Sequence, residues 1–260
     1  MKLTRKDFLR LCGLGLLALA GRKAVRAVSE AAATANTPTA ATTPRTPRRW
    51  GMVIDLQKCR QEGGCTDCVK ACTRAHNIPQ FADRQHEVKW IWNQPFETVF
   101  PQAQTDYTRQ EYAGHPITLL CNHCANPPCV RVCPTQATWK REDSGIVMMD
   151  FHRCIGCRYC MAACPYGSRS FNWQDPRPAI ATLNPDFPTR TKGVVEKCNF
   201  CEERLARAQR PACVESCGEK AMVFGNLADP ESEPRKLLRA RFSLQREPEL
   251  GTSPSVYYLV

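Results

Sequence analysis

The sequence lacks the common motifs that would give the chain a substrate reaction of its own. It has no glycine-rich phosphate-binding loop, no Ser/His/Asp arrangement for nucleophilic catalysis and no C-x3-C-x2-C radical motif. These absences exclude a nucleotide-dependent enzyme, a triad hydrolase and a radical enzyme of that type. We therefore expect any substrate chemistry linked to this chain to take place on another protein.

Apolar stretches are short. The run from Leu11 to Ala20 falls short of the roughly 20 residues that a membrane-spanning helix needs, but it suits the apolar region of an export signal. It follows Thr4-Arg5-Lys6-Asp7-Phe8-Leu9-Arg10, which resembles a twin-arginine signal with lysine in place of the second arginine. We expect residues 1–31 to be this export signal, with an uncleaved N-terminal anchor as the alternative.

Acidic residues are too few to balance the basic ones, and the excess is concentrated at the N-terminus. The formal net charge of +11 divides into +8 for residues 1–50 and +3 for residues 51–260. The body is only mildly basic, which gives no reason to expect a nucleic-acid partner. Residues 32–49 are rich in Ala, Thr and Pro, so we expect a flexible linker there.

Cysteine, by contrast, is abundant, with 17 in 260 residues. Cys12 lies inside the apolar run and is expected to act as a small hydrophobic residue. The other sixteen fall into four groups, which are Cys59, Cys65, Cys68, Cys72; Cys121, Cys124, Cys129, Cys133; Cys154, Cys157, Cys160, Cys164; and Cys198, Cys201, Cys213, Cys217. A secreted disulfide scaffold is the competing interpretation, but cysteines this close together do not readily pair with each other. Sixteen ligands are what four cubane iron–sulfur clusters require.

The spacing within the groups favours iron–sulfur clusters. The third group has the C-x2-C-x2-C-x3-C-P pattern of bacterial ferredoxins, and the second differs from it by two additional residues. In that pattern three close thiolates bind one cluster, and the fourth, before proline, binds another. Zinc is the alternative, because C-x2-C pairs also form zinc sites, but those sites rarely use two runs that each end in Cys-Pro. The longer gap from Cys59 to Cys65 makes the first group the least certain to hold a full cluster.

Short strands are expected to lead into the cysteine groups. The residue pattern predicts strands over 52–56, 88–92, 116–120, 145–149 and 221–225, a helix-prone segment over 202–210, and a loop over 175–193. Residues 79–114 are predicted to be an insertion whose Trp and Phe side chains belong to the core. The apolar ending Val256–Val260 is expected to lie back across the body. His123 is expected to lie at the surface or behind the ligands.

The order of the four groups resembles the four-cluster ferredoxin-like subunits that transfer electrons in dimethyl sulfoxide, polysulfide and tetrathionate reductases. The resemblance covers about residues 50–226 and all four groups. Within that family the chain looks most like the DsrO type, the exported iron–sulfur subunit of DsrMKJOP complexes in sulfur-metabolising prokaryotes. The features that carry this are the export signal, Met52–Asp55, Cys121–Cys129, Cys154–Cys157 and the ending Pro248–Tyr258.

The resemblance implies an α+β fold of two interleaved bacterial-ferredoxin-like [4Fe-4S] modules with insertions and an extended C-terminal tail. The body would span 50–226, with an outer module of 50–78 plus 191–226, an inner module of 115–178 and an insertion of 79–114, followed by the tail 227–260. Four [4Fe-4S] clusters would have the ligand sets Cys59, Cys65, Cys68, Cys217; Cys198, Cys201, Cys213, Cys72; Cys154, Cys157, Cys160, Cys133; and Cys121, Cys124, Cys129, Cys164. Some relatives have Trp at the position of Cys157 and a three-iron cluster, so here four irons are expected.

The same resemblance implies an electron-transfer subunit that is not catalytic alone. Its partners would be an NrfD-type quinone-binding membrane subunit, placed nearest the Cys121, Cys124, Cys129, Cys164 cluster, and a multiheme cytochrome or molybdopterin subunit. The chain would lie peripherally on the outer, periplasmic face of the cytoplasmic membrane. The alternatives are the same role in a molybdopterin tetrathionate or polysulfide reductase, and a zinc-stabilised interaction module.

Several basic residues lie close in sequence to the predicted ligands, namely Arg131, Arg158, Arg169, Lys197 and Lys220. Each either raises the reduction potential of a nearby cluster or is a solvated surface group. The second interpretation is the more common one for any single residue of this kind.

Overall fold

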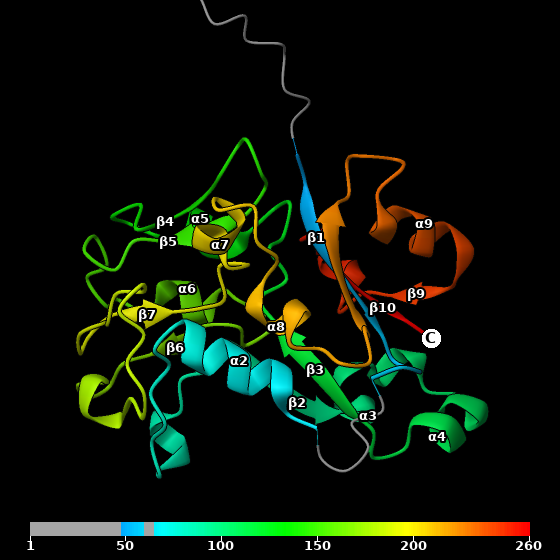
Figure 1. Cartoon of the computed structure of the whole chain (residues 1–260), viewed down its shortest axis with the longest axis horizontal. Coiled ribbons are helices and arrows are strands. Elements are labelled where there is room, and N and C mark those ends of the chain that lie inside the picture. Colours follow the sequence, from blue (N-terminus) through cyan, green and yellow to red (C-terminus); the bar gives the residue numbers. More distant parts are fainter. Residues whose placement is uncertain (1–47, 60–64) are drawn as a thin grey trace, which may run out of the picture. The chain divides into compact units, whose positions relative to one another are not determined.

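The computed structural model describes residues 48–59 and 65–260 (Figure 1). The predicted export signal, residues 32–47 of the predicted linker and the 60–64 stretch between Cys59 and Cys65 lie outside the described residues. Within the described part of the chain, no helix has the length and apolar composition needed to cross a membrane.

A four-stranded sheet joins the two ends of the body. Its order is β8–β1–β10–β9, formed by Met222–Asn226, Trp50–Asp55, Val256–Leu259 and Ser243–Leu244. β1 pairs in parallel with β10, where Ile54 is opposite Tyr258, and antiparallel with β8, where Met52 is opposite Phe224 (Figure 1). β1 is apolar throughout its centre because it is covered on both faces, and Met52, Val53 and Ile54 are fully buried. The strands predicted over 52–56 and 221–225 are confirmed, and the apolar ending, which was expected to lie back across the body, forms β10 beside β1.

A second strand pair joins the cysteine-free insertion to the segment that leads into the second cysteine group. β2 (Ile91–Pro95) pairs antiparallel with β3 (Pro116–Leu120). β3 has the predicted bounds, but the strand predicted over 88–92 begins only at Ile91. The reason is that the N–H of Lys89 donates to Ser170 Oγ, 2.8 Å away, instead of joining a strand ladder. Trp90, Trp92, Phe96 and Phe100 are buried, which confirms that these Trp and Phe side chains of the insertion belong to the core, whereas Tyr107 is exposed.

Short elements carry the remaining cysteine groups. The strand pairs are β4 (Thr138–Lys140) with β5 (Val147–Met149) and β6 (Ser170–Phe171) with β7 (Val195–Glu196). The helices of the described residues are α2 (Asp67–Ala75), α3 (Phe96–Val99), α4 (Asp106–Tyr112), α5 (Pro128–Arg131), α6 (Tyr159–Ala162), α7 (Glu202–Leu205), α8 (Ala212–Glu215) and α9 (Glu233–Ala240). Single 3-10 turns lie at Arg84–His86, Pro101–Ala103, Arg177–Ala179 and Pro248–Leu250. This mixture of helix and short sheet is an α+β fold.

The helix predicted over 202–210 is wrong beyond its first turn. α7 ends at Leu205, because Ala208 adopts a left-handed backbone with φ of 57°. The N–H of Gln209 then donates back to the carbonyl of Arg204 at 2.9 Å, which closes the turn. The charged composition favoured a helix, but the chain must turn here to bring α8 against α2.

A buried ion pair fastens the 175–193 loop to the core. Arg190 and Glu196 are both inaccessible to solvent, and Arg190 Nη2 lies 2.7 Å from Glu196 Oε2. Arg190 also donates to the carbonyls of His76 and Asn77, which follow α2. Glu196 accepts from the indole N–H of Trp90 at 3.0 Å. The pair therefore connects the loop, the end of α2 and the insertion, three segments far apart in sequence.

We expect Glu196→Gln to destabilise the fold by about 3–5 kcal/mol, because it leaves the Arg190 guanidinium buried without a counter-charge. The matched control is Asp175→Asn, which removes a carboxylate from an ion pair whose partners Asp175 and Arg177 are 41% and 56% exposed. Its effect should be much smaller, because water screens this exposed pair. Thermal unfolding followed by circular dichroism compares the two, and equal effects would contradict the assigned role of the buried pair.

Candidate functional site

The cysteines of the four sequence groups are all free thiols in the described part of the chain. They do not form the disulfide scaffold considered above. Eight of them are buried, seven are half-buried and only Cys65 is exposed. Their side chains gather in sets that combine cysteines from different sequence groups, and the neighbours of each thiol identify the sets.

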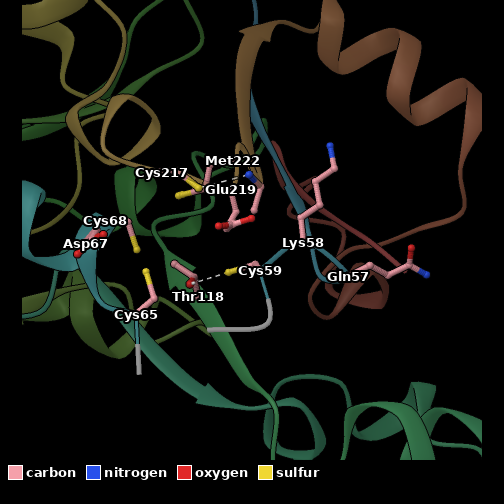
Figure 2. A pocket seen from close by; sticks show the side chains of 12 residues that line it. Gln57, Lys58, Cys59, Cys65, Asp67, Cys68, Thr118, Cys217, Glu219 and Met222 are labelled. Atoms are coloured by element: carbon pink, nitrogen blue, oxygen red, sulfur yellow. Dashed lines mark hydrogen bonds between the residues drawn. The ribbon is translucent and has the colours of Figure 1, made fainter. Parts of the chain in front are cut away.

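Set 1 consists of Cys59, Cys65, Cys68 and Cys217. These four line a cavity of about 340 Å³ and turn their sulfurs toward a common space (Figure 2). Cys59 follows β1 and Cys217 precedes β8, so the antiparallel pairing of these strands brings both to the same end of the sheet. Burial, and then the nearby Cys59, Cys217 and Cys65, raises the pKa of the Cys68 thiol to about 12.

Set 2 consists of Cys72, Cys198, Cys201 and Cys213. Cys72 lies on α2 and Cys213 on α8, and these two helices pack against each other. Burial, and then Cys201, Cys72 and Cys198, raises the pKa of Cys213 well above its ordinary value. Cys72 belongs to the first sequence group, yet its thiol neighbour is Cys201 of the fourth.

Set 3 consists of Cys121, Cys124, Cys129 and Cys164, which line one small cavity. β3 delivers Cys121 directly, because the strand ends at Leu120. Burial, and then Cys121, Cys129 and Cys164, raises the pKa of Cys124 to about 12, while Thr252 opposes the shift. Cys164 thus lies with the second sequence group instead of its own.

Set 4 contains Cys154 and Cys160. Burial raises the pKa of Cys160, with Arg169 opposing and with Cys129 and Cys154 adding to the shift. Cys157 is half-buried just before α6. Cys133 follows α5, which packs against α6, and we include it here on that packing. Although burial raises the pKa of Cys133, hydrogen bonds from Thr138, Thr135 and Ala137 outweigh it, so the net shift is downward.

The sets follow one another in a row. Cys68 of set 1 contributes to the pKa shift of Cys213 in set 2, Cys121 of set 3 to that of Cys198 in set 2, and Cys129 of set 3 to that of Cys160 in set 4. The order is therefore 1–2–3–4. Set 3 lies inside the row and most of its thiols are buried, whereas the sequence resemblance placed it at the end nearest a membrane partner. Sets 1 and 4 hold the end positions.

The same turn recurs in three of the sequence groups. The residue before the second cysteine has a left-handed backbone at His123, Gly156 and Phe200, with φ of 41°, 70° and 57°. This conformation costs roughly 1–2 kcal/mol for a residue other than glycine, so its repetition indicates a common requirement. It turns successive backbone N–H groups toward one side, as in anion-binding nests. At Phe200 the N–H donates to Cys198 Sγ at 3.4 Å.

A second turn recurs after the last cysteine of three groups. Gln136, Gly167 and Lys220 each lie three residues beyond that cysteine and have φ of 53°, 61° and 51°. The N–H of each donates back to the carbonyl of the cysteine, at 3.3, 3.4 and 3.1 Å respectively. Sequence spacing alone had linked only the second and third groups, and this geometry shows that the fourth is built in the same way.

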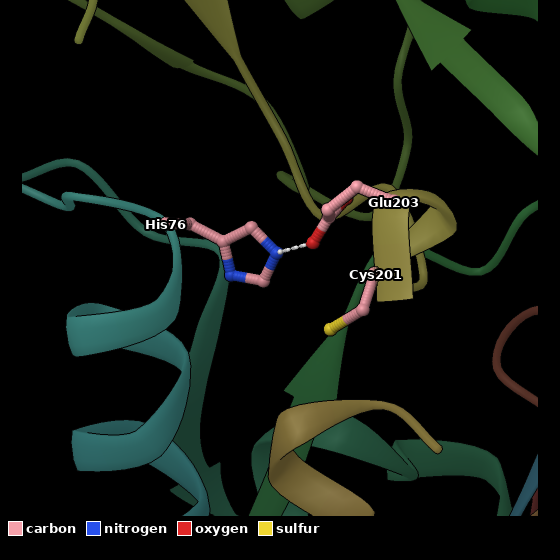
Figure 3. Close-up of side chains that lie close together, drawn as sticks. All are labelled: His76, Cys201 and Glu203. Carbon is pink, nitrogen blue, oxygen red and sulfur yellow. Dashed lines mark hydrogen bonds and ion pairs between the residues drawn. The ribbon is translucent and has the colours of Figure 1, made fainter. Parts of the chain in front are cut away.

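His76 is a neighbour of set 2 that sequence reasoning missed (Figure 3). Its Nε2 lies 2.9 Å from Glu203 Oε1, and its Nδ1 lies 3.1 Å from the carbonyl oxygen of Cys72 and 3.7 Å from Cys72 Sγ. Burial alone lowers the pKa of His76, but hydrogen bonds with Cys201, Cys72 and Glu203 raise it well above its ordinary value. The only signal in the sequence is its position four residues after Cys72, at the end of α2.

His76, Cys201 and Glu203 place one ligand atom each within 4.8 Å of one another, which is compact enough for a metal ion. The hydrogen bonds argue against such a site. Both ring nitrogens of His76 face oxygen acceptors, so both carry protons and neither has a lone pair for a metal. We therefore interpret His76 as a cation that donates toward Cys72 and Glu203.

His123 is buried, so the part of the prediction that placed it at the surface is wrong. Its ring stacks on Phe200 with centroids 3.7 Å apart, and its Nδ1 accepts from the N–H of Val147 at 3.1 Å. Burial, then Lys197 and Arg169, lowers the pKa of His123 well below its ordinary value. It is a neutral side chain packed between sets 2 and 3.

Comparison with known proteins agrees with the chemistry of these thiol sets. The family described as a 4Fe-4S dicluster domain matches residues 115–179 and 183–227. The chain is 44% identical over 234 residues to the Hdr-like menaquinol oxidoreductase iron-sulfur subunit 1 of Archaeoglobus fulgidus, covering 82% of this chain and 84% of that protein. The chain belongs to this family of iron–sulfur subunits.

Other members of the family are also similar. The menaquinone reductase iron-sulfur cluster-binding subunit of Nitratidesulfovibrio vulgaris is 38% identical, with 81% of this chain and 88% of that protein covered. A tetrathionate reductase subunit of Salmonella typhimurium is 40% identical, with 81% and 72% covered. As an iron–sulfur subunit of this family, the chain binds [4Fe-4S] clusters and transfers electrons within a larger oxidoreductase, and the zinc alternative has no support among these relatives.

We expect Gly156→Ala to weaken the Cys154–Cys157 turn more than Gly167→Ala weakens its own turn. Both glycines have positive φ, but a Cβ at Gly156 would overlap the carbonyl oxygen of Gly193, whereas nothing lies within 4 Å at Gly167. Either variant costs roughly 1–2 kcal/mol for the backbone, and Gly156→Ala adds about 1–3 kcal/mol of overpacking. The temperature at which anaerobic protein loses its visible absorbance measures the difference, and equal temperatures would show that this close approach is unimportant.

Proposed function

We propose that the chain holds four [4Fe-4S] clusters, one in each thiol set, and relays electrons along the row. The observation that carries this is the gathering of sixteen thiols, all but Cys65 buried or half-buried, into four successive sets. Burial, together with the mutual proximity of the thiols, raises the pKa of several of them, which is unfavourable for bare thiolates and is resolved when iron binds them. A [4Fe-4S] cluster, when bound, takes up and releases one electron.

The proposed ligand sets are crossed. Cys217 completes set 1, Cys72 completes set 2, Cys164 completes set 3 and Cys133 completes set 4. Exchange of the fourth cysteine between two runs is the bacterial ferredoxin arrangement, so the body consists of two interleaved modules. The neighbours of Cys68, Cys213 and Cys124 support the first three exchanges.

Backbone N–H groups that donate to cysteine sulfur influence the reduction potential of a bound cluster. The N–H of Ala221 donates to Cys217 Sγ at 3.3 Å, and the N–H of Ala212 donates to Cys201 Sγ at 3.4 Å. Such donors stabilise the more negative state of a cluster and raise its potential. Burial of sets 2 and 3 keeps water away from the middle of the row.

The surface beside set 4 is apolar and the surface beside set 1 is polar, which suits two different kinds of partner. Beside set 4, the side chains of Ile155 and Tyr159 are 66% and 62% exposed. Around set 1 the cavity is lined by polar groups that include Lys58, Asp67 and Glu219. We propose that an NrfD-type quinone-binding membrane subunit contacts set 4 and that a further redox subunit, a multiheme cytochrome, contacts set 1. This replaces set 3 as the contact to the membrane partner.

We assign the chain to the DsrO type within its family, on the outer face of the cytoplasmic membrane, because of its Arg5–Lys6 signal and its sequence features around the second and third groups. The similarity to two menaquinol- or menaquinone-linked subunits agrees with a quinone-linked complex. Changing Arg5 and Lys6 to Gln should leave the precursor in the cytoplasm. Cell fractionation tests this, and undiminished periplasmic protein would rule out the twin-arginine route.

The similarity to the tetrathionate reductase protein favours one alternative, in which the same row of clusters serves a molybdopterin reductase. The large partner distinguishes the two assignments. Purification of the native complex under mild detergent should recover a multiheme cytochrome with the chain if the DsrO-type assignment is right. Recovery of a molybdopterin subunit instead would establish the alternative.

We expect anaerobically purified protein to contain about sixteen irons and a matching amount of sulfide, since each cubane holds four. The crossing is then tested by counting damaged clusters in double variants with Mössbauer and EPR spectroscopy. Cys72→Ala with Cys201→Ala should damage one cluster, because both residues belong to set 2. Cys72→Ala with Cys68→Ala should damage two. Ligation within each sequence group would reverse this pattern and remove the basis for interleaved modules.

A further inference from the structure

Two of the five basic residues near the ligands are buried inside the row. Arg131, Arg158 and Lys220 are exposed, as solvated surface groups are. Arg169 and Lys197, in contrast, are only 5% and 1% exposed. Burying a charged side chain is unfavourable by several kcal/mol unless an opposite charge compensates it. The groups around Arg169 and Lys197 therefore show which negative charge compensates each of them.

Arg169 lies between sets 3 and 4. Its Nη2 donates to Cys129 Sγ at 3.0 Å and to Thr138 Oγ1 at 2.9 Å. Its Nη1 points to the thioether sulfur of Met149 at 3.7 Å. The guanidinium also interacts with Cys160 of set 4, so a single side chain faces thiols of two neighbouring sets.

Lys197 occupies the corresponding place between sets 2 and 3. Its ammonium donates to the carbonyl oxygens of Val147 and Cys198. Val147 lines the cavity of set 3 and Cys198 belongs to set 2, so these two bonds place the ammonium at the junction of the two sets. Burial lowers the pKa of Lys197 and the charge of Arg169 adds to this, whereas Cys121, Cys198 and Cys129 oppose the shift. Neither Lys197 nor Arg169 forms a salt bridge with a carboxylate among residues 48–59 and 65–260. The thiol sets, whose sulfurs become negative thiolates when they bind iron, are thus the groups that face both cations.

We propose that Arg169 and Lys197 are fixed positive charges that raise the reduction potential of the middle of the row, and of set 3 most, because it lies between them. This inference rests on the proposed function of the thiol sets. Reduction of a set by one electron adds one negative charge to it, and the electron comes from a quinol through the membrane partner or, in vitro, from dithionite. A nearby buried cation stabilises that added charge without the uptake of a proton.

Other polar groups of the interior do not single out set 3 in this way. Backbone N–H donors are present at sets 1 and 2 alike. Two further arginines are buried, but Arg190 has its own carboxylate partner in Glu196, and Arg246 lies over the ring of Tyr166 and donates to the carbonyl of that residue. His76 is a buried cation beside Cys72 of set 2, but Glu203 compensates its charge at 2.9 Å. Among the described residues, the buried cations that face thiols without a carboxylate partner lie at the two junctions that flank set 3, which is therefore expected to have a higher potential than set 1.

EPR-monitored redox titration of the full-chain protein with its clusters tests this. Arg169→Gln keeps a hydrogen-bond donor but removes the charge, and it should disfavour reduction of one cluster at least tenfold, a downward shift of about 59 mV in midpoint potential. Arg169→Lys keeps the charge and should retain most of the wild-type potential. Lys197→Met should lower the potential of the same cluster. The matched control is Arg158→Gln, in which an exposed arginine adjacent in sequence to Cys157 is neutralised and no shift is expected.

Several results would overturn the inference. Unchanged potentials in Arg169→Gln with full iron content would show that the charge is not the cause, and so would a loss of potential in Arg169→Lys as large as in Arg169→Gln. A shift that disappears at high salt would mark a solvent-exposed charge, since buried pairs are screened little. If Arg169→Gln does not fold, the Arg169→Lys and Lys197→Met titrations decide. The iron content of the wild type is measured first, so a failure of the four-cluster proposal is seen separately.

Discussion

The burial of so many thiols close together is the constraint on which the rest of the structure depends. Thiolates that approach one another in a poorly solvated interior repel, and the raised pKa values of Cys68, Cys124 and Cys213 express that repulsion together with the loss of solvation. Iron bound to the four thiols of a set relieves it, so folding and cluster assembly are coupled. The chain supplies the remaining compensation through backbone N–H donors, through His76 and through the two buried cations.

The proposed crossed ligand sets require distant segments to meet, and the four-stranded sheet and the Arg190–Glu196 ion pair bring such segments together. β1 and β8 hold Cys59 and Cys217 at one end of the same sheet, and β10 pairs with the other edge of β1. The Arg190–Glu196 pair fixes the approach of the last group to α2, which carries Cys72. The packing of α2 against α8 joins the same two groups, since these helices carry Cys72 and Cys213.

The charges inside the row give the middle and the ends different environments. Set 3 has a cation on either side, while sets 1 and 4 reach the surface with polar and apolar surroundings respectively. In the proposed relay, an electron entering at one end would meet a position of different potential in the middle before it leaves at the other end. This arrangement agrees with a subunit that connects two other redox proteins.

The sequence by itself determined the four groups of candidate ligands and the strands that lead to them. Cysteine spacing is a local property, and so is the apolar pattern that predicted β1, β3 and β8. Features that depend on distant contacts could not be predicted from the sequence. These are the start of β2, which a hydrogen bond from Lys89 to Ser170 sets, and the burial of His123 against Phe200. The early end of α7 was also not predicted. The order of the sets was also decided by the tertiary structure, which put Cys121 beside Cys198 and inside the row. Five basic residues looked alike in the sequence, and only packing distinguished Arg169 and Lys197 from the three at the surface, because burial is a property of everything that surrounds a side chain.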